Sequence, residues 1–145
     1  MKGELIRKEI VIMKLTKKQQ EINEKIARDI LAFLKEKYVW MDVTILFNNK
    51  AWSSNKTFKG IKGNMIEEPY ENEFDEVCGV YEYKNIDASQ WEYSNPETVT
   101  LLIDGICYEW FNDFGKIEEF EELLNKYNAY YEYGTACILS IYFNE

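Results

Sequence analysis

The sequence of 145 residues contains no histidine. Imidazole is the usual general base and the usual partner of a serine or cysteine nucleophile, so this absence excludes Ser-His and Cys-His pairs. It also excludes zinc sites of the HExxH type. The sequence therefore offers no standard hydrolytic centre, and we expect a protein that is not an enzyme, with no catalytic residues, no metal site and no cofactor.

Cysteine is scarce as well, and the chain holds only Cys78, Cys107 and Cys137. An odd number, at separations of 29 and 30 residues, fits neither a disulfide framework nor a CxxC metal site. Each cysteine lies among apolar neighbours, and free cysteine is one of the residues most often buried. The sequence therefore predicts three buried, reduced thiols.

Long apolar runs are also missing. The longest one early in the chain, Ile10 to Met13, ends at Lys14 and is shorter than the apolar core of a signal peptide. A bilayer span needs about 20 apolar residues. We expect a soluble, cytoplasmic protein that makes no membrane contact. It should form a single domain over residues 1–145, with residues 1–12 as a leading strand or an extension.

The chain is rich in tyrosine and in acidic charge. Its 11 tyrosines combine apolar area with a polar tip, which suits half-buried surfaces and interfaces. Residues 1–63 hold 14 Lys and Arg against 7 Asp and Glu, a net charge of +7. Residues 64–145 hold 3 against 19, a net charge of −16, which gives −9 for the whole chain. The acidic second half would repel phosphates. This charge argues against direct binding of nucleic acid and favours a basic partner.

The first part of the chain changes from helical to extended periodicity. A helix is predicted over residues 17–37 because apolar residues recur three and four positions apart, at Ile22, Ile26, Ile30, Phe33 and Leu34. Thr16 and Gln19 have the spacing of a capping box at its start. A period of two then predicts a strand over residues 39–47, a turn at residues 48–50 and a short return strand at 51–53. A long loop over 55–76 and strands over 77–84 and 90–93 are expected next.

The dipeptide Asp104-Gly105 separates two runs that are rich in β-forming residues. Asp-Gly between such runs is the usual signal of a type I′ hairpin, because both turn residues need positive φ. The sequence therefore predicts a hairpin over residues 98–111.

The C-terminal part predicts one more helix and one more strand. The helix is expected over residues 115–127, with one apolar side made of Ile117, Phe120, Leu123, Leu124 and Tyr127. The strand alternates Cys137, Leu139, Ile141 and Phe143. The fold class expected is α+β, a mostly antiparallel sheet of about five or six strands covered by two helices.

Four short patterns point to other chemistry, and each has an ordinary structural explanation. Gly60 to Gly63 has the spacing of a KH loop, but its flanks are not helical. Glu82 and Lys84, with Asp75 upstream, resemble the carboxylate and E-x-K pattern of metal-dependent nucleases, which an ordinary strand with outward charges also produces. The acidic stretch 67–76 lacks the EF-hand arrangement. Acids beside aromatics, as in a glycosidase cleft, are expected by chance among 26 acidic residues.

The C-terminal half, with its run Ile117-Glu118-Glu119-Phe120-Glu121-Glu122-Leu123 and then Tyr130-Tyr131-Glu132-Tyr133, resembles in character the small acidic immunity proteins of bacterial toxin systems. The resemblance implies a cytosolic inhibitor that occludes the basic active cleft of a toxin domain, nuclease-like in kind. Carboxylates would steer the encounter, and aromatic side chains would anchor the interface. From their charge and aromatic character, the residues expected to contact such a partner are Glu82, Tyr83, Glu118, Glu119, Glu121, Glu122, Tyr130, Tyr131 and Tyr133.

Two other functions stay open on the sequence alone. A phage-type anti-defence inhibitor that mimics DNA would need an acidic surface too, but its acids should spread along a long stripe. An immunity protein should instead concentrate its acids around aromatic anchors. The third possibility is a metal-dependent enzyme that uses Asp75, Glu82 and Lys84.

Overall fold

A computed structural model describes residues 15–55, 58–59, 65–66, 71–75, 79–112 and 117–145, with the backbone alone for 58–59, 65–66 and 71–75. The expected extension at 1–12, the glycine motif at 60–63 and Cys78 lie outside the described residues. The helices are α2 (Lys17–Glu36), the 3-10 helix η1 (Ala88–Gln90), α3 (Gly105–Asn112) and α4 (Glu118–Asn125). The strands are β1 (Val43–Phe47), β2 (Lys50–Ser53), β3 (Phe58–Lys59), β4 (Met65–Ile66), β5 (Glu71–Asp75), β6 (Val80–Lys84), β7 (Val99–Ile103), β8 (Ala129–Thr135) and β9 (Ile138–Phe143).

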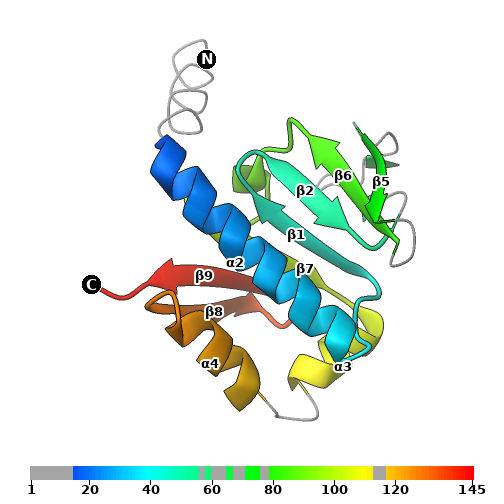
Figure 1. Cartoon of the computed structure of the whole chain (residues 1–145). Coiled ribbons are helices and arrows are strands. Elements are labelled where there is room, and N and C mark those ends of the chain that lie inside the picture. Colours follow the sequence, from blue (N-terminus) through cyan, green and yellow to red (C-terminus); the bar gives the residue numbers. More distant parts are fainter. Residues whose placement is uncertain (1–14, 56–57, 60–64, 67–70, 76–78, 113–116) are drawn as a thin grey trace.

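Seven of the described strands form one antiparallel sheet in the order β5-β6-β2-β1-β7-β9-β8, while β3 pairs with β4. The helix α2 crosses one face of this sheet, and α4 lies on the same face next to β8 (Figure 1). The predicted α+β class and the mostly antiparallel sheet are confirmed. The described sheet has more strands than the five or six expected, and α3 is an additional helix.

The predicted first helix is confirmed as α2. Thr16 caps it, because its Oγ1 accepts a hydrogen bond from the Gln19 amide at 3.0 Å. The return half of the capping box is absent: the Gln19 side chain donates to Asn23 Oδ1 at 3.0 Å instead. One stripe of the helix is buried against the sheet, which explains the spacing of Ile26, Ile30 and Leu34.

The first strand is shorter than predicted and begins at Val43. Tyr38 and Asp42 have φ angles of 59° and 56°, so the chain between α2 and β1 is bent rather than extended. The predicted turn is confirmed. Asn48 and Asn49 both have positive φ, 50° and 60°, as a two-residue type I′ turn requires, and they join β1 to β2.

The predicted hairpin over residues 98–111 is wrong in its second arm. The strand β7 forms as expected, but the following residues wind into α3, where the Tyr108 amide donates to the Asp104 carbonyl at 3.2 Å. The reason lies in the sheet: β7 pairs with β1 on one edge and with β9 on the other, so no edge is left for a hairpin partner. Helical winding instead buries Cys107 and Phe111, which are one turn apart.

Other differences concern weakly patterned segments. The predicted strand at residues 90–93 is wrong, since the described chain there follows η1 and bends. The expected loop over 55–76 contains the strands β3, β4 and β5. The segment 129–135 forms β8, an edge strand that the sequence did not suggest. The second helix is confirmed as α4 from Glu118 onward; residues 115–116 lie outside the described part of the chain.

The main core lies between the sheet and its helices. Alternate strand residues such as Ile45, Leu101 and Leu139 point into it, together with the apolar sides of α2, α3 and α4. A smaller core lies on the opposite face of the sheet and consists of Leu46, Ala51, Tyr83, Ile86, Ala88 and Trp91. The segment that contains η1 therefore covers part of the second face.

Replacing Gly105 with alanine should lower the free energy of unfolding by about 2 kcal/mol, because φ there is 54° and a Cβ would lie 2.9 Å from Asp42 Oδ2. Gly79 is the matched control: its φ is 62°, but a Cβ there would meet no atom of the described residues within 4 Å. Its alanine variant should cost about 1 kcal/mol from backbone strain alone. Urea unfolding of both variants measures the difference, and equal losses would refute the role of the Asp42 contact.

Candidate protein-binding surface

Four glutamates on α4 form the most concentrated charge on the described surface of the acidic half. Glu118, Glu119, Glu121 and Glu122 are all exposed. They surround the outer side of a helix whose inner side buries Phe120, Leu123 and Leu124. Negative charge in the first turns of a helix is favoured by the helix dipole, so these acids also suit the start of α4.

The tyrosines expected at the site lie on β8, the strand beside α4. Tyr130 and Tyr133 are 41% and 40% exposed, and Tyr131 is half-buried between them. The Tyr131 ring packs edge-on against Phe120 of α4 at 5.4 Å between centroids. The Tyr133 hydroxyl donates to the Phe111 carbonyl at 3.3 Å, which ties β8 to α3. The tyrosines are thus held by the fold while two of them keep much of their surface in water.

The structure brings one of the α4 glutamates and the three tyrosines to one depression, which we call the acidic groove. It has a volume of about 370 Å³ and lies between α4 and β8. Its lining consists of Glu121, Leu124, Asn125, Ala129, Tyr130, Tyr131 and Tyr133. Two segments that the sequence separates by a turn therefore combine into a single surface with apolar walls and a carboxylate at its margin.

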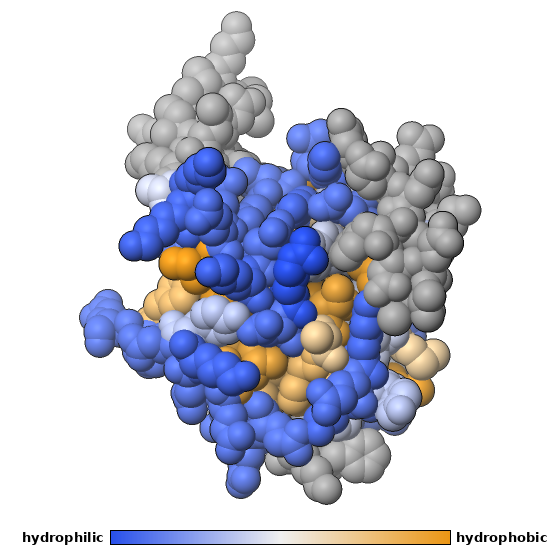
Figure 2. Space-filling model, in the orientation of Figure 1, coloured by the Kyte–Doolittle hydropathy of each residue, from blue (hydrophilic) through white to orange (hydrophobic). Residues whose placement is uncertain are grey.

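A second cleft, of about 460 Å³, lies on the other side of α4, where that helix meets α2. Glu119 and Glu122 line it from α4, and Asp29 and Glu36 line it from α2. Lys37 forms an ion pair with Glu119, which neutralises part of this charge. The face that carries α2 and α4 is largely hydrophilic around a band of hydrophobic residues (Figure 2). Acidic side chains therefore flank α4 on both sides.

The structure does not bring Glu82 and Tyr83 to this surface. Both lie on β6, and β6 is separated from β8 by four strands of the sheet. Tyr83 is only 1% exposed, belongs to the smaller core and donates its hydroxyl hydrogen to the Asn55 carbonyl at 3.1 Å. The expectation that Tyr83 contacts a partner is wrong, because its ring has almost no accessible surface.

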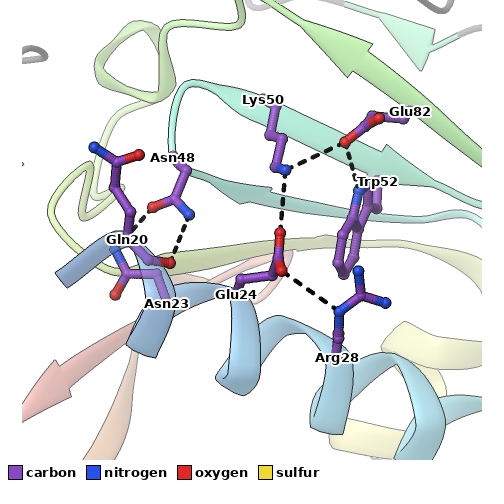
Figure 3. Close-up of polar contacts among 8 residues, drawn as sticks. All are labelled: Gln20, Asn23, Glu24, Arg28, Asn48, Lys50, Trp52 and Glu82. Atoms are coloured by element: carbon purple, nitrogen blue, oxygen red, sulfur yellow. Dashed lines mark hydrogen bonds and ion pairs between the residues drawn. The ribbon is translucent and has the colours of Figure 1, made fainter. Parts of the chain in front are cut away.

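Glu82 belongs to a separate polar cluster around Trp52 (Figure 3). Its carboxylate accepts a hydrogen bond from Trp52 Nε1 at 3.2 Å and pairs with Lys50 Nζ at 3.3 Å. Lys50 also pairs with Glu24 of α2 at 3.4 Å, and Arg28 lies 5.1 Å from the centre of the Trp52 ring. The Glu82 side chain is 15% exposed. Its charge is thus used to hold α2, β2 and β6 together.

These contacts give a structural role to the glutamate of the E-x-K pattern formed by Glu82 and Lys84. The Glu82 carboxylate already has two donors, and Asp75 is described by its backbone alone, paired with Val80. Lys84 is exposed and lies across from Lys50 in the sheet. Within the described residues no group of three or more Cys, Asp or Glu side chains is placed to hold a metal ion. The described part of the chain therefore gives the pattern a structural explanation.

The two described cysteines differ in their exposure to solvent. Cys107 is buried and reduced as predicted, and burial raises the pKa of its thiol to about 12. Cys137 is also free, but it is exposed at the turn between β8 and β9. The expectation that Cys137 is buried is wrong because its apolar neighbours enter β9 while the cysteine itself lies before that strand begins.

Comparison of this chain with protein-family models, with curated proteins and with solved structures found no match. Among the helices of the described part, none has both the length and the apolar character that a bilayer span requires.

Alkaline titration tests how the tyrosines are placed. Burial raises the pKa of Tyr83, Tyr127 and Tyr131 from 10 to about 12. Below pH 10 folded and unfolded chains both keep these protons, and above it the unfolded chain loses them first. The free energy of unfolding should therefore fall as pH rises from 10 to about 12. Tyrosinate absorbance should show late titration of these three groups and of Tyr133, whose pKa burial also raises, and one late group fewer after Tyr131→Phe. Simultaneous titration of all 11 tyrosines near pH 10 would contradict this placement.

Removing the central cation of the Trp52 cluster should be costly. Lys50→Met leaves the carboxylates of Glu24 and Glu82 without it, so we expect a loss of about 1–3 kcal/mol in the free energy of unfolding. Arg28→Met is the matched control and should cost less than about 1 kcal/mol, since Arg28 is 57% exposed. Adding Glu82→Gln to Lys50→Met should recover part of the loss; no recovery in denaturant unfolding would refute the unpaired charge as its cause.

Proposed function

We propose that this chain is an inhibitor that binds a basic protein, a toxin domain, through the surface formed by α4 and β8, and that it acts by covering the partner's active cleft rather than by catalysis. The observation that carries the proposal is the juxtaposition of Glu121 with three tyrosines at the acidic groove, on a helix that carries three further exposed glutamates. Glu118, Glu119, Glu121 and Glu122 supply the charge.

The two kinds of residue have complementary roles in such an interface. Exposed carboxylates raise the rate of encounter with a basic surface, and their effect decreases with salt. Tyrosine supplies a large, rigid contact area at little entropic cost, and buried tyrosines are frequent hot spots. Tyr133 is the anchor on the α4 side in this proposal, because it is 40% exposed while its strand is fixed on one side by β9. Tyr130, 41% exposed, lies on the opposite face of β8 and stacks on Tyr142.

The arrangement of the acids supports an inhibitor of a toxin over a mimic of DNA. The four glutamates lie within a helix of eight residues, which is about 12 Å long. Phosphates of one DNA strand recur about every 3.4 Å, so such a helix matches only about four of them. Acids that are concentrated beside aromatic residues fit a compact protein interface better than an extended stripe.

Charge reversal of α4 tests the proposal. We expect the wild-type chain to capture a basic protein from its source cell and to inhibit that protein's activity once it is purified. Substituting lysine for Glu118, Glu119, Glu121 and Glu122 should abolish capture, because the steering charge is inverted. The matched control substitutes lysine for four other exposed glutamates, Glu92, Glu97, Glu109 and Glu145, and should retain most of the binding.

Each variant needs a thermal unfolding curve, because the change at Glu119 also removes its ion pair with Lys37. The association rate of the wild type should fall as salt is raised beyond about 0.1 M, where the screening length is about 10 Å. An acidic partner would contradict the proposal. Equal binding by the folded, α4-reversed variant at low salt would contradict it as well.

A further inference from the structure

The strand β8 ends the main sheet and is paired on one side only, with β9. It runs from Ala129 to Thr135, and its regular pairing extends to Tyr133, after which the register shifts. Within the described residues no other backbone donates to this strand or accepts from it. An edge of this kind presents a row of free backbone donors and acceptors.

The register identifies which groups face outward. Asn144 donates its amide hydrogen to the Asn128 carbonyl at 2.8 Å, which makes these residues a hydrogen-bonded pair of the β8–β9 ladder. Hydrogen-bonded and non-bonded pairs alternate along an antiparallel ladder. Three residues of β8 therefore belong to non-hydrogen-bonded pairs with β9: Ala129, Tyr131 and Tyr133. Their N–H and C=O groups point away from β9.

The outward edge runs beside the acidic groove and is accessible at Tyr133 and in part at Tyr131, whereas Ala129 is only 1% exposed. All three of the outward-facing residues line that groove, together with Glu121 of α4. The regular part of β8 contains no proline and no lysine, two residues that natural edge strands often use to prevent pairing. At its far end, Gly134 packs closely against Tyr93, whose Cβ would lie 1.9 Å from an added Cβ. The open edge is thus the stretch from Tyr131 to Tyr133, since Ala129 is buried.

We propose that a partner of this chain contributes an extended, basic segment that pairs with β8 as an eighth strand of the main sheet, and that the backbone groups of Tyr131 and Tyr133 make its hydrogen bonds. This inference rests on the proposed function and specifies how the partner is held. Strand addition supplies affinity through the main chain, whereas side chains on alternate positions supply specificity.

The charges beside β8 determine which kind of segment fits its open edge. A strand in this position would lie next to Glu121 on the α4 side and near Glu132, which is exposed on the opposite face of β8. A basic segment gains from both carboxylates. A second copy of this chain would bring its own β8 and α4, so that like charges would oppose one another across the new pairing. The edge therefore fits a basic segment of another protein and disfavours self-association.

The test uses a defined probe, an acetylated and amidated heptapeptide with three threonines between two pairs of lysines. The control peptide has proline at two adjacent threonines. The control peptide keeps the charge of the threonine peptide. Because neighbouring amides of a strand point to opposite edges, two adjacent prolines remove one N–H donor from each edge of the peptide. Amide hydrogen exchange of the isotope-labelled chain is measured with each peptide up to about 10 mM, which detects dissociation constants in the millimolar range.

The threonine peptide should slow exchange of the Tyr131 and Tyr133 amides about fourfold at a concentration of about three times its dissociation constant. It should also give nuclear Overhauser effects between its backbone and that of β8, and the proline peptide should give neither. Absence of both signals with the threonine peptide would overturn the inference. So would equal effects of the two peptides, which would indicate electrostatic association alone.

Self-association is a further outcome. If sedimentation shows a dimer of the chain alone, and the β8 amides become protected as its concentration rises, the occupant is a second copy and the inference is overturned. The proposed function is tested separately by charge reversal of α4. If that reversal abolishes capture of a basic protein while the peptide does not pair, the proposed function stands and strand addition at β8 is wrong.

Discussion

The pairing of β7 on both of its edges is the constraint on which the rest of the fold depends. One edge holds β1 and, beyond it, the N-terminal strands; the other holds β9 and then β8. Because neither edge is free, the chain leaves the sheet after Ile103 and forms α3. It then has to return along α4 before it can re-enter the sheet. The position of α4 over β8, and hence the acidic groove, follows from that detour (Figure 1).

The parts of the chain on the two sides of β7 also differ in charge. The basic part of the chain includes α2, whose Arg28 is used within the fold at the Trp52 cluster, together with Lys50 of β2. The acidic part provides α4 and β8. Among the described ion pairs, the one that involves an α4 glutamate joins Lys37 to Glu119. Exposed carboxylates cost little in water and are available to a basic surface.

Local signals in the sequence predicted the elements that local physics controls. The cap at Thr16 and the apolar stripe of α2 need no knowledge of the rest of the chain. The positive φ at Gly105 was also predictable from Asp-Gly. What followed that turn was not, because the outcome depended on whether an edge of β7 was free. Sequence periodicity carries no information about pairing between distant strands.

The candidate site could likewise be predicted only in part from the sequence. The glutamates of α4 and the tyrosines of β8 were recognisable by composition, but β8 itself was missed because its tyrosines and Glu132 do not alternate as apolar and polar residues do in half-buried strands. Tyr83 was misassigned for a related reason: a tyrosine beside charged residues resembles a surface position, yet Tyr83 shares a face with Tyr81 over the smaller core. Trp52 offered a usable signal for Glu82, since a buried indole N–H needs an acceptor.

The most direct test of the account is a hydrogen-exchange footprint of the chain bound to the basic protein that it captures. Protection should be greatest at the outward amides of Tyr131 and Tyr133 and should extend to α4, with little change in β6 and η1. Protection that is confined to β6, η1 or the exposed side of α2 would contradict the claim that α4 and β8 form the binding surface.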